Sequence, residues 1–126
     1  MTDAEILQTV RRLEHCDFKP GDFHHRDHLA VAVVYLYATD LPGALDRMRN
    51  SLQRFISHHG LKGYHETITC FWMHQVEKQL DRGLCLAESV GRAQAMLSDK
   101  NLVYRHYRRE TLHSSQARER WVEPDQ

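Results

Sequence analysis

The segment from Asp27 to Ala38 carries the strongest constraint on the fold, because its run HLAVAVVYLYA has apolar residues on nearly all sides. A helix that is apolar all round has to be buried by its neighbours. The valine-rich middle also suits a strand, but the run is long for a strand, contains no turn signal and has no second β-type run to pair with. The segment therefore predicts a central helix in an all-α protein.

The other long segments repeat apolar residues at helical spacing, with capping and stop signals between them. They predict helices over about residues 3–16, from the cap at 40 to about 58, about 64–80 and about 86–97. Asp3 and Asp40 are the cap candidates, and Gly60 and Gly83 are the stop signals. Residues 101–126 lack apolar periodicity and predict one or two helical turns and an irregular tail wrapped on the bundle. Since 126 residues suit one domain, we expect residues 1–126 to form a single-domain bundle of about five helices.

Charge and composition exclude several classes of partner. The 17 Lys and Arg residues balance the 17 Asp and Glu residues, so no net field attracts nucleic acid or an anionic membrane. No apolar run reaches the length of a bilayer span, and residues 1–15 have the pattern of a polar amphipathic helix rather than a signal sequence. The three cysteines lack the spacing of a disulfide framework. We therefore expect a soluble, cytoplasmic protein without nucleic-acid or membrane partners.

Two groups of metal-capable side chains stand at helix starts in a chain with ten histidines. His25 and His28 are three residues apart and share one face of the central helix. His65 heads the apolar stripe of the helix over 64–80, and Glu66 lies on its flank. Imidazole nitrogens and a carboxylate make a mixed ligand set for Zn²⁺, Fe²⁺, Mn²⁺ or Ni²⁺. The pattern predicts a divalent transition metal held by these four residues between the second and fourth helices.

The first functional hypothesis is a metal-dependent hydrolase, lyase or oxygenase acting on a small polar molecule. Glu66 either ligates the ion or serves as general base for a bound water, and Tyr64 beside it is a candidate catalytic residue. Tyr35 is a candidate for orienting the substrate. Arg118 is a candidate for pairing with its carboxylate or phosphate.

The second hypothesis is a non-catalytic ligand-binding or homo-oligomeric module. Here His25, His28, His65 and Glu66 form a buried hydrogen-bond network that joins the second and fourth helices, with Glu66 accepting from His25 or His28. Exposed aromatic residues then serve a homodimer interface. A zinc-protease helix is excluded, because Thr69 stands where the second histidine of that motif belongs.

The two histidine segments also carry a resemblance that covers most of the chain. F-H-H-R-D-H-L and Y-H-E-T-I-T, followed by S-x-x-A-R and a closing P-D, resemble a family of small, uncharacterised bacterial all-helical proteins with F-x-H-x-x-H-L and Y-H-E-T motifs. The matching positions are Phe23, His25, His28, Leu29, Tyr64, His65, Glu66, Thr67 and, more loosely, Ser115, Ala117, Arg118, Pro124 and Asp125. The basic segment over 105–108 departs from the pattern. The resemblance implies no particular activity.

Overall fold

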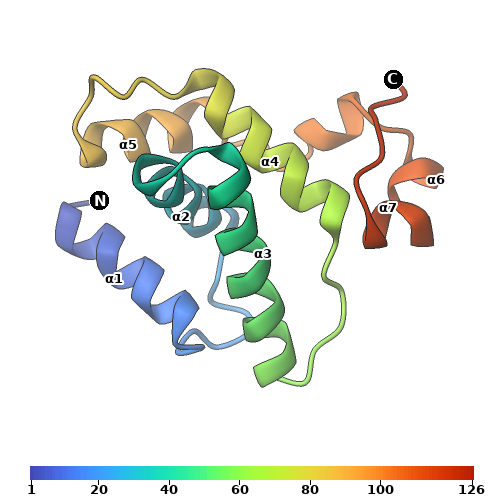
Figure 1. The fold of residues 1–126 in the computed structure, drawn as a ribbon, viewed down its shortest axis with the longest axis horizontal. Helices are drawn as coiled ribbons and strands as arrows, with labels where there is room; N and C mark the ends of the chain where they lie inside the picture. The colour runs from blue at the N-terminus through green and yellow to red at the C-terminus, as the bar shows by residue number, and fades with distance from the viewer.

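The computed structural model describes all 126 residues and contains only helices and the loops between them (Figure 1). The five long helices are α1 (Asp3–Glu14), α2 (His25–Ala38), α3 (Leu41–His58), α4 (Glu66–Gln79) and α5 (Leu86–Met96). Three short elements follow, the 3₁₀ helix η1 (Leu102–Arg105), α6 (Arg109–Leu112) and α7 (Ser115–Glu119). The predicted all-α bundle of about five helices is confirmed. None of the helices is long and apolar enough to cross a membrane.

α2 lies at the centre of the bundle and packs against α1, α3, α4 and α5. Its buried residues are Leu29, Ala30, Val31, Ala32, Val33, Tyr35 and Leu36, which places apolar side chains on nearly every side of the helix. They belong to one core cluster of 25 buried residues. The predicted central helix is confirmed, and it starts two residues earlier than expected. The Asp27 carboxylate accepts a hydrogen bond from the His24 amide at 3.0 Å, so His24 becomes the residue that precedes the first turn.

The capping residues of α3 are those that the sequence predicts, whereas the cap of α1 differs by one residue. Asp40 caps α3 as expected, since its carboxylate accepts from the Gly43 amide at 3.0 Å. Gly60 follows α3 with φ of 65°, the left-handed conformation that ends many helices. The cap of α1 is Thr2 rather than Asp3, because the Thr2 hydroxyl accepts from the Glu5 amide at 3.1 Å and the Glu5 carboxylate accepts from the Thr2 amide at 2.9 Å.

α4 is shorter at both ends than the sequence predicts. His65 caps the helix instead of forming part of it, because its ring Nδ1 accepts from the Ile68 amide at 3.1 Å. Tyr64 therefore lies in the preceding loop. The helix ends at Gln79, before the expected stop at Gly83.

The end of the chain, residues 120–126, forms an extended segment that we call the C-terminal strap. It lies beside α4, close to α6 and α7 (Figure 1). The Thr67 hydroxyl of α4 donates to the Arg120 carbonyl at 2.8 Å and accepts from the Val122 amide at 3.1 Å. The Tyr107 hydroxyl donates to the Val122 carbonyl at 2.5 Å. The tail predicted to wrap on the bundle is thus held by a buried threonine.

Replacing Thr67 with valine is expected to lower the free energy of unfolding by about 2 kcal/mol, because two backbone groups of the strap lose their partner. Valine keeps the volume, and Thr67 is 0 % exposed, so water does not replace the lost bonds. Urea unfolding measures the change, and amide hydrogen exchange at Val122 should accelerate. Thr9→Val is the matched control, since that buried hydroxyl bonds only to its own helix at Glu5. Equal losses in the two variants would contradict the role of Thr67.

Candidate functional site

His25 connects the start of α2 to the end of α5. Its Nε2 lies 2.7 Å from the Leu97 carbonyl, and because a carbonyl only accepts, Nε2 carries the proton. The ring also packs edge-on against Trp72 of α4, with 4.5 Å between centroids. His25 therefore ties three helices together.

His28 is one turn further along α2, and its Nε2 is buried without a hydrogen-bond partner. Its nearest ring neighbour is Phe23, with 6.0 Å between centroids. Burial, followed by the charge of His25, lowers the pKa of His28 to about 4. The imidazole is consequently neutral at pH 7.

His65 uses both ring nitrogens. Nδ1 accepts from the Ile68 amide at 3.1 Å, which leaves the proton on Nε2, and Nε2 donates to the Leu112 carbonyl at 2.6 Å. Burial lowers the pKa of His65. The sequence correctly predicts its inward position, since the residue is only 9 % exposed. Its ring has no lone pair left for a metal ion.

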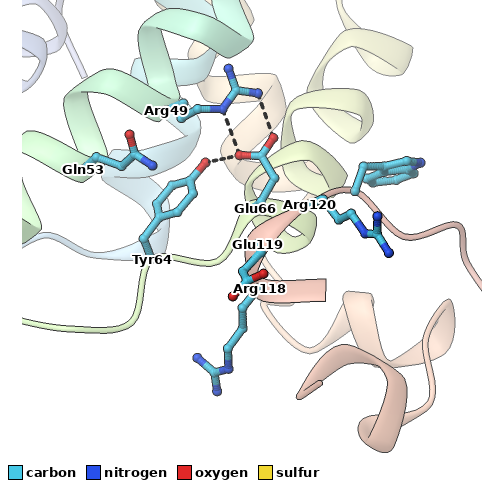
Figure 2. A pocket seen from close by; sticks show the side chains of 8 residues that line it. Arg49, Gln53, Tyr64, Glu66, Arg118, Glu119 and Arg120 are labelled. Atoms are coloured by element: carbon cyan, nitrogen blue, oxygen red, sulfur yellow. Dashed lines mark hydrogen bonds and ion pairs between the residues drawn. The ribbon is translucent and has the colours of Figure 1, made fainter. Parts of the chain in front are cut away.

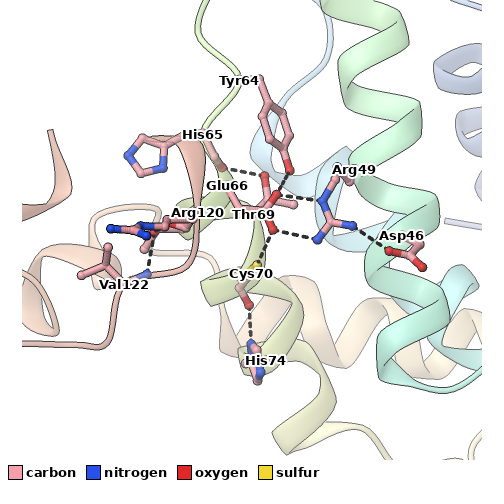
Figure 3. Close-up of polar contacts among 11 residues, drawn as sticks. Asp46, Arg49, Tyr64, His65, Glu66, Thr69, Cys70, His74, Arg120 and Val122 are labelled. Carbon is pink, nitrogen blue, oxygen red and sulfur yellow. Dashed lines mark hydrogen bonds and ion pairs between the residues drawn. The ribbon is translucent and has the colours of Figure 1, made fainter. Parts of the chain in front are cut away.

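Glu66 is held by donors from two helices and the preceding loop (Figure 3). Arg49 of α3 grips both carboxylate oxygens, from Nε to Oε1 at 2.9 Å and from Nη2 to Oε2 at 2.7 Å. The Tyr64 hydroxyl donates to Oε1 at 2.5 Å, and the Cys70 thiol donates to Oε2 at 3.2 Å. The four donors occupy the usual lone-pair positions of a carboxylate.

These contacts set the protonation of the cluster. The bonds from Arg49 lower the pKa of Glu66 to about 2, so its carboxylate is ionised at neutral pH. Burial raises the pKa of the Tyr64 hydroxyl, and the bond to Glu66 adds to the rise. Burial and the same carboxylate raise the pKa of the Cys70 thiol to about 12. At neutral pH the thiol and the phenol both keep their protons.

The structure does not gather the four expected metal ligands. His25 packs against Trp72, which is seven residues beyond His65 and so about 10 Å along the α4 axis. No group of three or more His, Cys, Asp and Glu side chains is arranged to hold a metal ion. The metal site stays a prediction, without a ligand group in the structure. Glu66 likewise accepts from Arg49 rather than from His25 or His28, so its network joins α4 to α3 instead of α2.

Tyr35 lies in a separate polar cluster. Its hydroxyl donates to Glu14 of α1 at 2.6 Å and lies 2.8 Å from the Ser51 hydroxyl of α3. The residue is 1 % exposed and lines none of the cavities. Its role in the structure is to join α1, α2 and α3.

Three of the sequence-predicted residues, Tyr64, Glu66 and Arg118, do share a cavity of about 620 Å³, which we call the arginine pocket (Figure 2). Further lining residues that the sequence did not single out are Arg49 and Gln53 from α3 and Glu119, Arg120 and Trp121 from the C-terminal end. For the three C-terminal residues, the only sequence signal is the charged run over 118–120, which directly precedes a tryptophan. Nothing in the sequence links the two α3 residues to the site.

One arginine of the pocket has carboxylate partners, whereas two others have none. Each of the three guanidinium nitrogens of Arg49 has a partner, since Glu66 accepts from Nε and Nη2 and the Asp46 carboxylate lies 2.6 Å from Nη1. The side chains of Arg118 and Arg120 make no hydrogen bond or ion pair. Figure 2 shows these two guanidinium groups at the rim, extending away from the Arg49–Glu66 pair. The rim therefore offers two unpaired cations against the single carboxylate of Glu119.

The chain shows no match to any family model, to any curated protein or to any solved structure. The resemblance drawn from its two motifs accordingly stays a prediction. The chemistry of the arginine pocket is the ground on which a function can be argued.

Proposed function

We propose that this protein binds a small molecule carrying a carboxylate or phosphate group in the arginine pocket. The observation that carries the proposal is the pair of unpaired arginines, Arg118 and Arg120, at the mouth of a cavity that holds only two carboxylates. One of those carboxylates, Glu66, is already neutralised by Arg49. The remaining balance at the rim is positive, which favours an anionic ligand.

Guanidinium groups suit such a ligand because their planar donors match two oxygens of a carboxylate or phosphate at once. Both rim side chains are exposed, so they are free to turn toward a bound anion. Ordering a long side chain costs up to about 2 kcal/mol, and a charge-assisted hydrogen bond contributes about 1.5–3 kcal/mol. Two hydrogen bonds from one guanidinium therefore outweigh the cost of ordering that one side chain.

The interior wall of the pocket is arranged before any ligand arrives. Arg49, Tyr64 and Glu66 hold one another through short hydrogen bonds, and the Arg49 and Glu66 side chains are only 29 % and 12 % exposed. Because the Tyr64 hydroxyl donates its proton to Glu66, its oxygen acts toward a ligand only as an acceptor. The amide of Gln53, also on this wall, supplies both a donor and an acceptor.

The protonation of this wall favours binding over acid–base chemistry. A general base works best with a pKa near the working pH, whereas the pKa of Glu66 is held at about 2. The raised pKa of Tyr64 makes the phenol a poor proton donor. We therefore propose a ligand-binding module as the function. The metal-dependent enzyme, the homodimer and the cytoplasmic location expected from the sequence stay predictions.

Titration with inorganic phosphate and with succinate tests the proposal and separates the two ligand chemistries. We expect at least one of them to bind with a 1:1 stoichiometry by calorimetry and to shift the backbone amide resonances of Arg118 and Arg120. The double variant Arg118→Ala/Arg120→Ala should weaken that binding at least about tenfold, and salt should weaken wild-type binding.

The matched control is Arg11→Ala/Arg92→Ala, which removes two exposed arginines outside the pocket and the same net charge. This variant should retain the affinity of the wild type. The proposal is wrong if neither anion binds, or if the two double variants lose affinity equally, since the latter result would reflect net charge alone.

A further inference from the structure

A second cavity, of about 180 Å³, lies between α4 and the C-terminal end of the chain. α4 contributes Phe71, His74, Gln75 and Lys78, which are spaced i, i+3, i+4 and i+7 and so share one face of the helix. His106, Trp121, Glu123 and Pro124 line the opposite wall. We call this cavity the ring pocket, because four of its eight lining side chains are planar rings.

The rings of the two walls contact one another in pairs, so a ligand lies beside these pairs and not between their members. Phe71 and His106 have 5.2 Å between centroids, and His74 and Trp121 have 5.4 Å with planes inclined by 34°. Flat side chains on both walls favour a flat ligand, which contacts them face-on or edge-on. A protein cavity of about 150 Å³ is known to hold benzene, so the ring pocket has room for one six-membered ring and a small substituent.

The polar groups of the pocket specify what the substituent should be. The Nδ1 atom of His74 lies 2.7 Å from the Cys70 carbonyl, and it must be the donor because a carbonyl only accepts. With this proton on Nδ1, the remaining lone pair of the imidazole is on Nε2, which makes no hydrogen bond to a protein group. The nearby charges of Lys78 and Glu123 are opposite, and the Trp121 indole N–H donates to Glu123 at 3.1 Å. The pocket thus combines an unfilled imidazole acceptor on His74 with the unpaired Gln75 amide and His106 ring, and it carries no strong net charge.

We propose that the ring pocket binds a neutral, single-ring aromatic molecule bearing one O–H or N–H donor, with His74 Nε2 accepting from that donor. Phenol is the simplest molecule with this chemistry. The site is distinct from the arginine pocket and needs none of its arginines, although Trp121 lines both cavities.

Three probes of similar size test the proposal on the unmodified protein. Phenol has the ring and the donor, cyclohexanol has the donor without the flat ring, and anisole has the ring without the donor. Binding is followed by NMR through the Trp121 indole N–H and the ring protons of His74. We expect phenol to bind at least about threefold more tightly than either comparison probe, the factor that one hydrogen bond supplies.

Two variants of His74 separate the acceptor from the ring. His74→Ala should weaken phenol binding about tenfold, because both the hydrogen bond and a ring wall are lost. His74→Phe keeps a ring and should abolish the preference for phenol over anisole. His15→Ala, which removes an exposed imidazole outside every cavity, should bind phenol as the wild type does.

Three results would overturn the proposal. Equal affinity for phenol and cyclohexanol would overturn it, as would a His74→Phe protein that still prefers phenol over anisole. Absence of any shift at Trp121 with phenol at about 10 mM would also overturn it, because fragments of this size bind preformed pockets in the millimolar range. The probe comparison decides the matter on its own if a variant fails to fold. Arg118→Ala/Arg120→Ala should leave phenol binding unchanged, which distinguishes this site from failure of the arginine pocket.

Discussion

Replacing Arg49 with leucine is expected to lower the free energy of unfolding at pH 7 by about 3 kcal/mol, because the substitution leaves the Glu66 carboxylate without its main partner. The Glu66 side chain is only 12 % exposed, so water replaces little of what is lost. The remaining donors, Tyr64 and Cys70, are neutral and stabilise the charge less well. Urea unfolding, followed by circular dichroism, measures the change.

A double-mutant cycle isolates the pair. Arg49→Leu/Glu66→Leu removes both charges, and we expect it to be more stable than Arg49→Leu alone, since no buried carboxylate is stranded. Asp46→Ala is the matched control, because Asp46 is 72 % exposed and its bond to Arg49 should contribute less than about 1 kcal/mol. Additive losses at Arg49 and Glu66 would contradict the pairing.

The dependence on pH provides an independent check of the same pair. The folded-state pKa of Glu66, about 2, is below its ordinary value of 4.5, so its stabilising contribution is complete above pH 4.5 and is lost as the pH falls toward 2. In Arg49→Leu the pKa is no longer held down by a cation, and that loss should be absent. The difference in stability between wild type and variant should therefore shrink between pH 4.5 and 2.

Mild acid is expected to destabilise the protein through His28. Its folded-state pKa, about 4, is below the ordinary value of 6.5, so the unfolded chain takes up a proton before the folded one does. Stability is unaffected above pH 6.5, falls as the pH decreases from 6.5 to 4 and then levels off. The shift corresponds to a loss of about 3 kcal/mol.

His28→Leu removes the titrating group while keeping a side chain of similar size. We expect the variant to lose about 3 kcal/mol less than the wild type when urea unfolding is compared at pH 7 and pH 4. A parallel loss in both proteins would show that another group is responsible. His65 is the main alternative, because burial lowers its pKa as well. The exposed His15→Ala should behave as the wild type does.

The fold could be predicted where the signal is local. The all-round apolar run over 27–38 correctly indicated a buried central helix. Asp40 and Gly60 correctly marked the two ends of α3, because capping depends on residues that are neighbours in sequence. The first residue of α4 was missed, since His65 satisfies the amide of Ile68 with a ring nitrogen, and imidazole is outside the usual set of capping side chains.

The site was predicted only in part, because its contacts join residues that are distant in sequence. Tyr64 and Glu66 were identified from the motif that contains them, but their partner Arg49 is one of several charged residues on the polar side of α3. Helical periodicity shows which face a residue occupies and says nothing about which distant side chain it meets. His65 illustrates the same limit, since its inward position was correct and its partner is the backbone of Leu112, in a segment without periodicity.

Trp121 is shared by the arginine pocket and the ring pocket. Its indole is part of the wall of the arginine pocket and of the ring pocket, and its N–H is fixed by Glu123 at the border of the second. If an anion in one cavity alters how the indole is held, the affinity of the other cavity for a ring changes with it. The factor by which the anion changes the affinity for the ring then equals the factor by which the ring changes the affinity for the anion, because coupling between two binding equilibria is reciprocal. The two proposed ligands would therefore share one side chain of the protein, Trp121.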